Sequence, residues 1–360
     1  MEFNLEKFFV EVFAPGKDEV VTIMIDIPKE EKDDNNEWKE RRKMADEWRH
    51  ELNNFSGKYS LTVNPLVKYY STNNNNTDLP EKCFWETEKK ELREVIENST
   101  IIISMTEFSA TAPLYRHTLT IPKLRVGSMP GVLKSMEETA LSADHKKIAE
   151  TCRTLKPLFD QAVGIEVTFS TGHKCYYDIS NNNIVYEDDG VLHPAEEDEK
   201  VVRLRNLPTG EVCTCPNELS NSKTSGEIPV TISGELIVFK VEKNKIVDII
   251  GKGKVAENYR LKFNNEKALC NIAEVAIGCN DKAVVTGNVL EDEKAGFHWA
   301  YGLSDHMGGT ISVKDFSSPD KIEHIDIVYA KGNPIVCAKL DFVFKDGSRK
   351  TVIKNGELIL

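Results

Sequence analysis

The apolar run at residues 20–27 is the feature that most constrains the fold of this chain. It reads V-V-T-I-M-I-D-I and ends at Pro28. A strand with one face in water alternates apolar and polar side chains, whereas a strand covered on both faces is apolar almost throughout. We therefore expect a buried strand of a parallel sheet here, with helices on both faces of that sheet.

The segments that follow alternate between the two kinds of secondary structure. Residues 37–52 and 86–98 are polar segments whose apolar side chains recur at helical spacing. Residues 59–70 and 101–105 are strand candidates. This alternation predicts an α/β N-terminal domain with a mostly parallel sheet. No G-x-G-x-x-G follows the first strand and no G-x-x-x-x-G-K-[ST] occurs, so the pattern favours a scaffold over a nucleotide-binding domain.

The pattern changes after one strong helix. This helix is predicted to begin at Ser142, as its N-cap, and to run to about Val163. Residues 164–179 look like a hairpin, and later strand candidates include 281–289 and 323–329. The second part of the chain is therefore expected to be mixed but mainly antiparallel β.

A chain of 360 residues is long enough for two domains. We expect an α/β scaffold domain over residues 1–160. We expect a larger, β-rich α+β domain over residues 161–360, and this domain contains the candidate site described below.

Charge and cysteine usage limit the classes of function. The net charge of −12 disfavours binding to nucleic acid and to anionic lipid, both of which require a basic surface. No apolar run approaches the 18 residues of a membrane-spanning helix, and residues 1–7 do not resemble a signal peptide. The eight cysteines are scattered, which is typical of reduced thiols, so a cytoplasmic location is expected.

Potential metal ligands are concentrated between residues 271 and 328. Three of the eight histidines lie there, His298, His306 and His324. Six carboxylates accompany them: Glu274, Glu291, Asp292, Glu293, Asp305 and Asp326. Imidazole and carboxylate are ligands that zinc, cobalt, manganese and iron accept in proteins.

The segment I-E-H-I-D-I-V at residues 322–328 is the most informative part of this region. Side chains alternate along a strand, so His324 and Asp326 share one face, and Ile325 and Ile327 share the other. The isoleucines predict a well-buried strand, in which a carboxylate needs a partner. A metal ion held by His324 and Asp326 is one such partner, and a hydrogen-bonded His–Asp pair in a polar crevice is the other interpretation.

Several short motifs together resemble the aminopeptidase T family of metallopeptidases. They are P-T-G-E-V, which ends at Val212, N-I-A-E-V from Asn271, D-E-K from Asp292, then H-x-A-x-G from His298 and H-x-D from His324. The segment S-M-P-G at residues 128–131 and the segment A-L-S-A-D at 140–144 also resemble that family. The resemblance covers about residues 120–330, and it is specific because the motifs occur in the family's order.

This resemblance implies a peptidase that is a homodimer with two divalent metal ions per chain, such as zinc, cobalt or manganese. By motif, it implies the following metal ligands: Glu211, Glu274, His298, His324 and Asp326. It implies a metal-bound hydroxide as the nucleophile toward a peptide or other small-molecule substrate. Glu211 or Glu293 would then carry the proton to the leaving amine.

The chain departs from the family at one metal ligand. The family places a tyrosine seven residues after the first histidine, and that position is Asp305 here. Tyr301 and His306 are nearby candidates at other spacings. A related possibility is a mononuclear iron enzyme, because a ring-cleaving dioxygenase that acts on dihydroxypyridine resembles the same family in fold. Two histidines and one carboxylate suit non-haem Fe(II), and a non-catalytic member that binds a small ligand is the third possibility.

Overall fold

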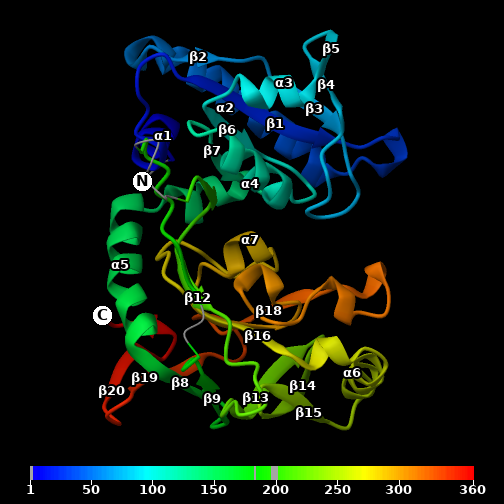
Figure 1. Cartoon of the computed structure of the whole chain (residues 1–360), viewed down its shortest axis with the longest axis vertical. Coiled ribbons are helices and arrows are strands. Elements are labelled where there is room, and N and C mark those ends of the chain that lie inside the picture. The colour runs from blue at the N-terminus through cyan, green and yellow to red at the C-terminus, as the bar shows by residue number, and fades with distance from the viewer. Residues whose placement is uncertain (1–2, 182–183, 196–201) are drawn as a thin grey trace. The chain divides into compact units, whose positions relative to one another are not determined.

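The structure is a computed structural model that describes residues 3–181, 184–195 and 202–360. The chain forms two compact units, which are drawn as ribbons in Figure 1. Over the described residues, no helix is both long enough and apolar enough to cross a membrane. All eight cysteines are free thiols.

The chain enters unit 1 twice. Unit 1 comprises Met1–Ala149 and Asp188–Thr209, and unit 2 comprises Glu150–Glu187 and Gly210–Leu360. The boundary expected from the sequence instead divides the chain once, after residue 160. The second passage belongs to unit 1 because its strand β11 pairs in parallel with β7, and helix α5 begins in unit 1 and ends in unit 2.

Unit 1 contains a mixed sheet. Its strands are β1 (Val20–Ile27), β2 (Thr62–Val63), β3 (Val67–Tyr70), β4 (Lys82–Trp85), β5 (Glu88–Glu91), β6 (Ile101–Ser104), β7 (Arg125–Ser128) and β11 (Leu204–Asn206). The order is β11-β7-β6-β1-β3-β4-β5, with β2 also beside β1. The strands from β11 to β3 pair in parallel, and β4 and β5 add an antiparallel edge. The predicted buried strand β1 is thus at the centre of the parallel part.

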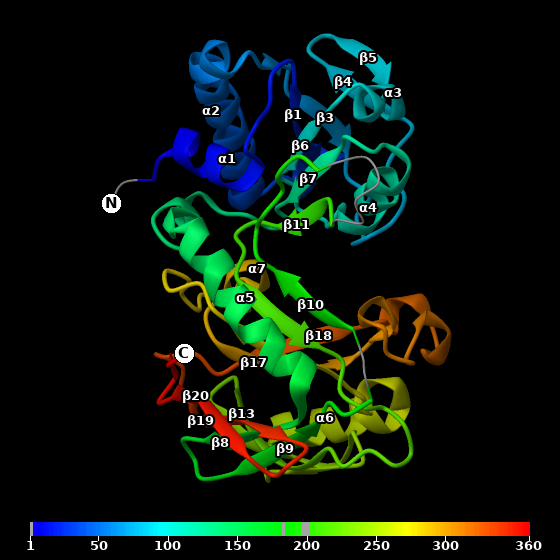
Figure 2. The ribbon, with the colours of Figure 1, turned by 60° about the vertical axis from the view of Figure 1, so that its left-hand side comes forward.

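Helices cover both faces of this sheet. They are α1 (Leu5–Phe13), α2 (Asn36–Tyr59), α3 (Leu92–Glu97) and α4 (Thr111–Thr120). Figure 2 shows α1 and α2 on one side of the strands and α3 and α4 on the other. Met24, Ile102 and Val126 of the sheet pack with Val95 of α3 and Leu114 of α4 in one apolar cluster. The scaffold expected from the apolar runs is therefore present.

The prediction of a helix over residues 86–98 is mostly wrong. Glu86 takes a positive φ of 55° and turns the chain, so residues 88–91 form strand β5 against β4. Helix α3 occupies only Leu92–Glu97. Tertiary pairing with β4 therefore overrides the local helical pattern.

The start of α5 (His145–Gln161) also differs from the prediction. The Ser142 hydroxyl donates a hydrogen bond to the carbonyl oxygen of Thr139. Asp144 caps the helix in its place, since its carboxylate accepts hydrogen bonds from the backbone N–H groups of Lys146 and Lys147.

Unit 2 contains two antiparallel sheets. The larger runs in the order β15-β14-β13-β9-β8-β19-β20-β21 and the smaller in the order β10-β12-β16-β17-β18. The larger sheet consists of β8 (Ala162–Phe169), β9 (Lys174–Asp178), β13 (Ser225–Ile232), β14 (Glu235–Glu242), β15 (Lys245–Ile250), β19 (Cys337–Phe344), β20 (Arg349–Lys354) and β21 (Glu357–Leu358). The smaller consists of β10 (Val185–Asp188), β12 (Glu211–Thr214), β16 (Ile272–Gly278), β17 (Phe297–Gly302) and β18 (His324–Val328). The prediction of a mainly antiparallel second part is confirmed.

Aromatic side chains fill the space between these two sheets. Phe297 and Trp299 of β17 meet Tyr177 of β9 and Phe239 of β14, with ring centroids 6.0 and 5.9 Å apart. Helix α6 (Lys254–Asn265) adds Phe263 to the same cluster. This packing fixes one face of β17 in the core and leaves its other face for the site.

The stretch expected to be a strand at residues 281–289 is an irregular segment with a turn and a bend, and its last residue begins helix α7 (Val289–Asp292). The Asp292 carboxylate accepts hydrogen bonds from the backbone N–H groups of Thr286 and Gly287. These bonds hold the segment as a loop, which explains why it does not pair with a sheet.

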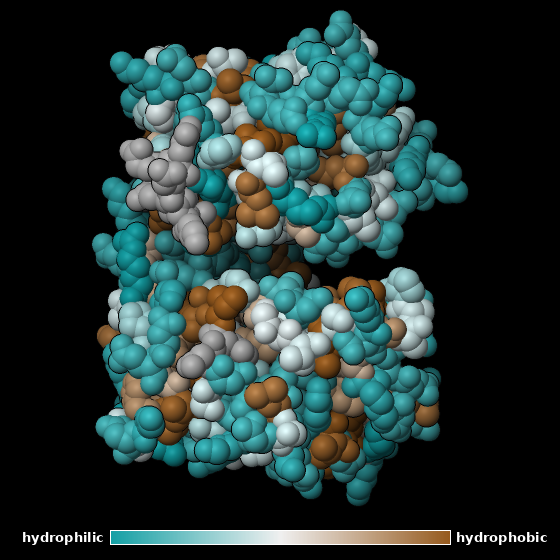
Figure 3. Space-filling view, viewed as in Figure 1, coloured by the Kyte–Doolittle hydropathy of each residue, from teal (hydrophilic) through white to brown (hydrophobic). Residues whose placement is uncertain are grey.

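Figure 3 shows a surface on which hydrophilic residues dominate and apolar residues form separate patches. Exposed large apolar side chains such as Leu119, Leu261 and Val313 come from different elements. This distribution is ordinary for a protein surface.

Candidate metal centre

Four adjacent strands bring the predicted ligands onto one face of the smaller sheet. Glu211 of β12 is opposite Gly278 of β16. In the pairing of β16 with β17, Glu274 is opposite Ala300. Asp326 of β18 is opposite Ala300 from the other side. Because side chains alternate along each strand, residues far apart in sequence emerge together on this face.

The donors form two groups that share one carboxylate. Glu211, Glu274 and His298 form the first, and Glu274, His324 and Asp326 form the second, with their donor atoms within 4.8 Å of one another in each group. Nε2 of His298 lies 3.4 Å from Oε2 of Glu211 and 3.8 Å from Oε1 of Glu274. Nε2 of His324 lies 3.0 Å from Oε2 of Glu274 and 3.6 Å from Oδ1 of Asp326. All five predicted ligands therefore converge.

Backbone hydrogen bonds orient both imidazoles. The Nδ1–H of His298 donates to the carbonyl oxygen of Gly296 at 3.1 Å. The Nδ1–H of His324 donates to the carbonyl oxygen of Leu303 at 2.7 Å. A carbonyl oxygen only accepts, so Nδ1 holds the proton and Nε2 is directed at the carboxylates. This orientation is characteristic of histidines that bind a metal through Nε2.

The carboxylates of the two groups favour positive charge at the Nε2 atoms of His298 and His324. Burial disfavours the charged form of His298, but the carboxylates of Glu211 and Glu274 outweigh it and raise the pKa of this imidazole to about 9. Burial opposes charge on His324 as well, yet Asp326 and Glu274 raise the pKa of His324 well above its usual value. Either a proton or a metal ion can supply this charge.

Two buried atoms of the first group have no hydrogen-bond partner among the described residues. They are Oε2 of Glu211 and Nε2 of His298. A buried polar atom without a partner costs free energy, and a lone pair on nitrogen opposite a carboxylate oxygen is the arrangement that a bound cation satisfies. These two atoms therefore fit either a metal ion or a proton on Nε2 of His298, and the second group offers the same types of ligand to a metal ion.

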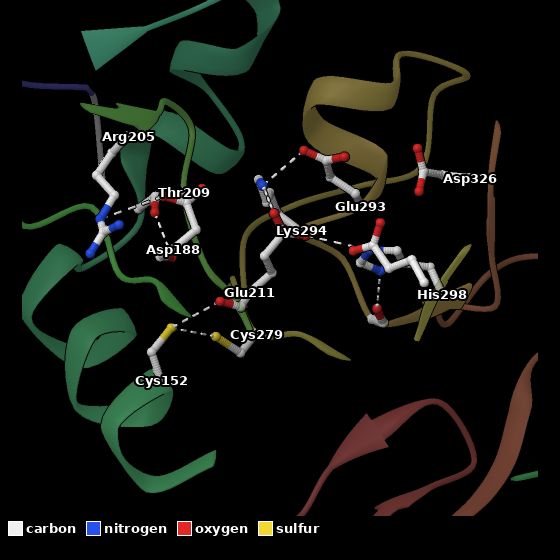
Figure 4. A network of polar contacts seen from close by, with 12 residues as sticks. Cys152, Asp188, Arg205, Thr209, Glu211, Cys279, Glu293, Lys294, His298 and Asp326 are labelled. Carbon is white, nitrogen blue, oxygen red and sulfur yellow. Dashed lines mark hydrogen bonds and ion pairs between the residues drawn. The ribbon is translucent and has the colours of Figure 1, made fainter. Parts of the chain in front are cut away.

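Lys294 is a member of this site that the sequence analysis does not identify as a functional residue. Its side chain is fully buried, and its Nζ lies 2.5 Å from Oε1 of Glu211 and 2.8 Å from Oε1 of Glu293. Figure 4 shows Lys294 between these two glutamates. Burial favours the protonated form of Glu211, but Lys294 and His298 outweigh it and lower the pKa of this carboxylate to about 2. In the sequence Lys294 is the last residue of the D-E-K motif, but the motif does not show that this lysine is buried between carboxylates.

Glu293 is held near the same cluster. Its carboxylate has little access to solvent, and burial raises the pKa of Glu293 to about 8 despite the nearby Lys294. This is a carboxyl group that can hold a proton near neutral pH.

The three additional candidates do not join the two groups. Tyr301 is buried on the opposite face of β17, where its ring packs on Phe263 with centroids 5.1 Å apart. The side chain of Asp305 is 43% exposed and that of His306 is 50% exposed, on a 3-10 turn at residues 305–307. The His306 ring meets the His324 ring edge-on, with centroids 4.8 Å apart. His306 therefore lies next to the second group without being part of it.

The burial expected of the H-x-D strand is also wrong in part. Strand β18 is at the edge of its sheet, and Ile325 is 38% exposed. The carboxylate of Asp326 is nevertheless largely covered, because it points to the side where the other ligands lie.

No protein-family model matches the chain, and no curated protein sequence matches it. Two solved structures are similar over nearly the whole chain. One is 2,5-dihydroxypyridine dioxygenase from Pseudomonas putida KT2440, with a TM-score of 0.62, 16% identity and coverage of 99% of this chain and 96% of that one. The other is AmpT, an aminopeptidase T, from Thermus thermophilus, with a TM-score of 0.58, 14% identity and coverage of 99% of each chain. The chain therefore has a fold that an aminopeptidase and a dioxygenase share.

Proposed function

We propose that this chain is a metal-dependent hydrolase that cleaves an amide bond in a peptide or other small substrate with a free amine. The observation that carries the proposal is the pair of donor groups that share Glu274 on one face of the smaller sheet. Glu274 belongs to both, so a divalent ion at either group would depend on it. Zinc, cobalt and manganese all accept this set of ligands.

The residues around these groups suit hydrolysis. A divalent ion bound there supplies a Lewis acid for a carbonyl oxygen and lowers the pKa of water. His298 and His324 are held by backbone carbonyls, so their Nε2 atoms need no reorientation to bind. The carboxyl group of Glu293, whose pKa is raised to about 8 by burial, can take up a proton and pass it to a leaving amine.

The test is metal-dependent hydrolysis of amino-acid anilides. The protein is stripped with a chelator, dialysed and reconstituted separately with zinc, cobalt and manganese. We expect anilide cleavage to return with at least one of these ions and to be lost in Asp326→Asn. Glu266→Gln is the matched control, because Glu266 is a buried carboxylate bonded to Ser317 outside the site. Metal binding without cleavage of any anilide would contradict the hydrolase proposal.

A second candidate is a mononuclear Fe(II) ring-cleaving dioxygenase. The observation that favours it is the absence of a further ligand from the described surroundings, since Tyr301 faces the core and Asp305 faces solvent. Two histidines with one carboxylate suit non-haem iron. Oxygen consumption by the iron-loaded chain with 2,5-dihydroxypyridine, and not with iron-loaded Asp326→Asn, would support this candidate over hydrolysis.

A further inference from the structure

The environment of Lys294 bears on how many ions the centre can hold. Of the two donor groups, the one that contains Glu211 already has a cation in contact with it. Nζ of Lys294 lies 2.5 Å from Oε1 of Glu211, whereas the contacts among Glu274, His324 and Asp326 involve carboxylates and an imidazole.

The chain fixes the position of this lysine. The backbone N–H of Lys294 donates to the carbonyl oxygen of Glu291 at 2.9 Å, and its carbonyl oxygen accepts from Asn280 N–H at 3.0 Å. Gly278 lets this segment lie directly against β16, because a Cβ there would overlap the carbonyl groups of Glu293 and Lys294. The backbone of Lys294 is therefore held on both sides of its Cα, which limits where the side chain can place its ammonium.

Moving the ammonium away is unfavourable. The Lys294 side chain has no exposure to solvent, and a buried charge that loses its partner is strongly destabilising. A divalent ion on the remaining oxygen of Glu211 would be close to this ammonium in a region where water screens charges weakly, so the two cations would repel.

We propose that the Lys294 ammonium takes the place of a second metal ion at Glu211, so that the centre binds one ion through Glu274, His324 and Asp326. This inference rests on the proposed metal-dependent function. It narrows that function to a one-metal centre with a tethered positive charge beside it, and it makes Lys294 a positioning residue for Glu211 and Glu293.

The test is the number of Co²⁺ ions per chain, measured by elemental mass spectrometry after equilibrium dialysis. We expect one ion in the wild type and two in Lys294→Met, because the variant frees Glu211 for a second ion. The double variant Lys294→Met/Glu211→Gln should return to one ion. Lys331→Met is the control, since Lys331 forms an exposed pair with Glu357, and it should bind one ion.

A second variant keeps the test decisive if Lys294→Met does not fold. Glu211→Gln leaves Lys294 paired with Glu293, and we expect it to bind one Co²⁺ with a Kd within about threefold of the wild type. Two ions in the wild type, one ion in folded Lys294→Met, or a Kd in Glu211→Gln weakened more than tenfold would each overturn the inference while the metal-dependent function stands. No ion in any of these proteins would overturn the proposed function itself.

Discussion

Replacing Glu274 with glutamine should remove most of the stabilisation that metal gives to the chain, while the stability in the absence of metal should fall less. Glu274 is the carboxylate that both donor groups share, with Oε2 at 3.0 Å from Nε2 of His324 and Oε1 at 3.8 Å from Nε2 of His298. Glutamine has the same shape but lacks the negative charge. The variant therefore separates the role of charge from that of packing.

The size of the effect follows from binding linkage. Metal at 100 times its Kd stabilises the native state by about 2.7 kcal/mol. Loss of a group that only supports a ligand weakens metal affinity by about 10- to 100-fold, so we take 100-fold as the least effect of losing Glu274 itself. At the same metal concentration the stabilisation of the variant would then fall to about 0.4 kcal/mol.

Thermal unfolding with and without Co²⁺ measures this difference. For a unit of this size, about 2–4 °C accompanies each kcal/mol. We therefore expect metal to raise the Tm of the wild type by roughly 5–10 °C and that of Glu274→Gln by about 1 °C. The metal-free Tm should fall less than the metal-bound Tm, because the amide oxygen of glutamine can still accept the hydrogen bond that Nε2 of His324 donates to Oε2 of Glu274.

Glu266→Gln is the matched control and should keep the full metal-induced rise in Tm. A Glu274→Gln protein whose Tm responds to metal as strongly as that of the wild type would refute the reasoning. So would a metal-free Tm that drops by the same amount as the metal-bound one, since the role of Glu274 would then be structural.

Three further predictions concern other parts of the chain. His145 is buried, and desolvation lowers its pKa from 6.5 to about 4. As pH falls, the unfolded chain therefore binds this proton before the folded chain does. Stability should fall by up to about 3 kcal/mol as pH drops from about 6.5 to about 4. Urea titrations at pH 4, 5 and 7 should show this loss in the wild type but not in His145→Phe, and equal pH slopes would contradict it. Gly278→Ala should lower the free energy of unfolding by about 1–3 kcal/mol in the same assay, because its Cβ has no room against the neighbouring backbone. An unchanged unfolding midpoint would contradict this and show that the backbone can move. The thiols of Cys152 and Cys279 are 3.4 Å apart, so hydrogen peroxide should join them in a disulfide, detected as a 2-Da loss that Cys152→Ser abolishes.

Much of the fold could be predicted from local patterns. The apolar run of β1 and the alternation in β18 each specify a strand. A strand buried on two faces is apolar throughout, and a strand buried on one face alternates apolar and polar residues. Residues 88–91 show the limit of such patterns. Their composition suits a helix, and only the turn at Glu86 and the pairing with β4 make them a strand.

The candidate site could also be partly predicted from local sequence patterns. The spacing of His324 and Asp326 places both on one face of a strand wherever that strand lies. The position of Tyr301 could be predicted too, since it is three positions after His298 and an odd offset on a strand directs the two side chains to opposite faces. The exposure of Asp305 could not be predicted from the sequence, because it depends on a 3-10 turn beyond the end of β17.

The sequence by itself determined which residues can be metal ligands and which of them share a face, because side-chain chemistry and the period of a strand are local properties. Only the tertiary structure decided that Glu211 and Glu274 lie beside the two histidines, since antiparallel pairing of β12, β16, β17 and β18 sets that register. It also decided the role of Lys294. A lysine has the same chemistry on a surface and in a core, and burial between two carboxylates, which no local pattern encodes, makes it part of the centre.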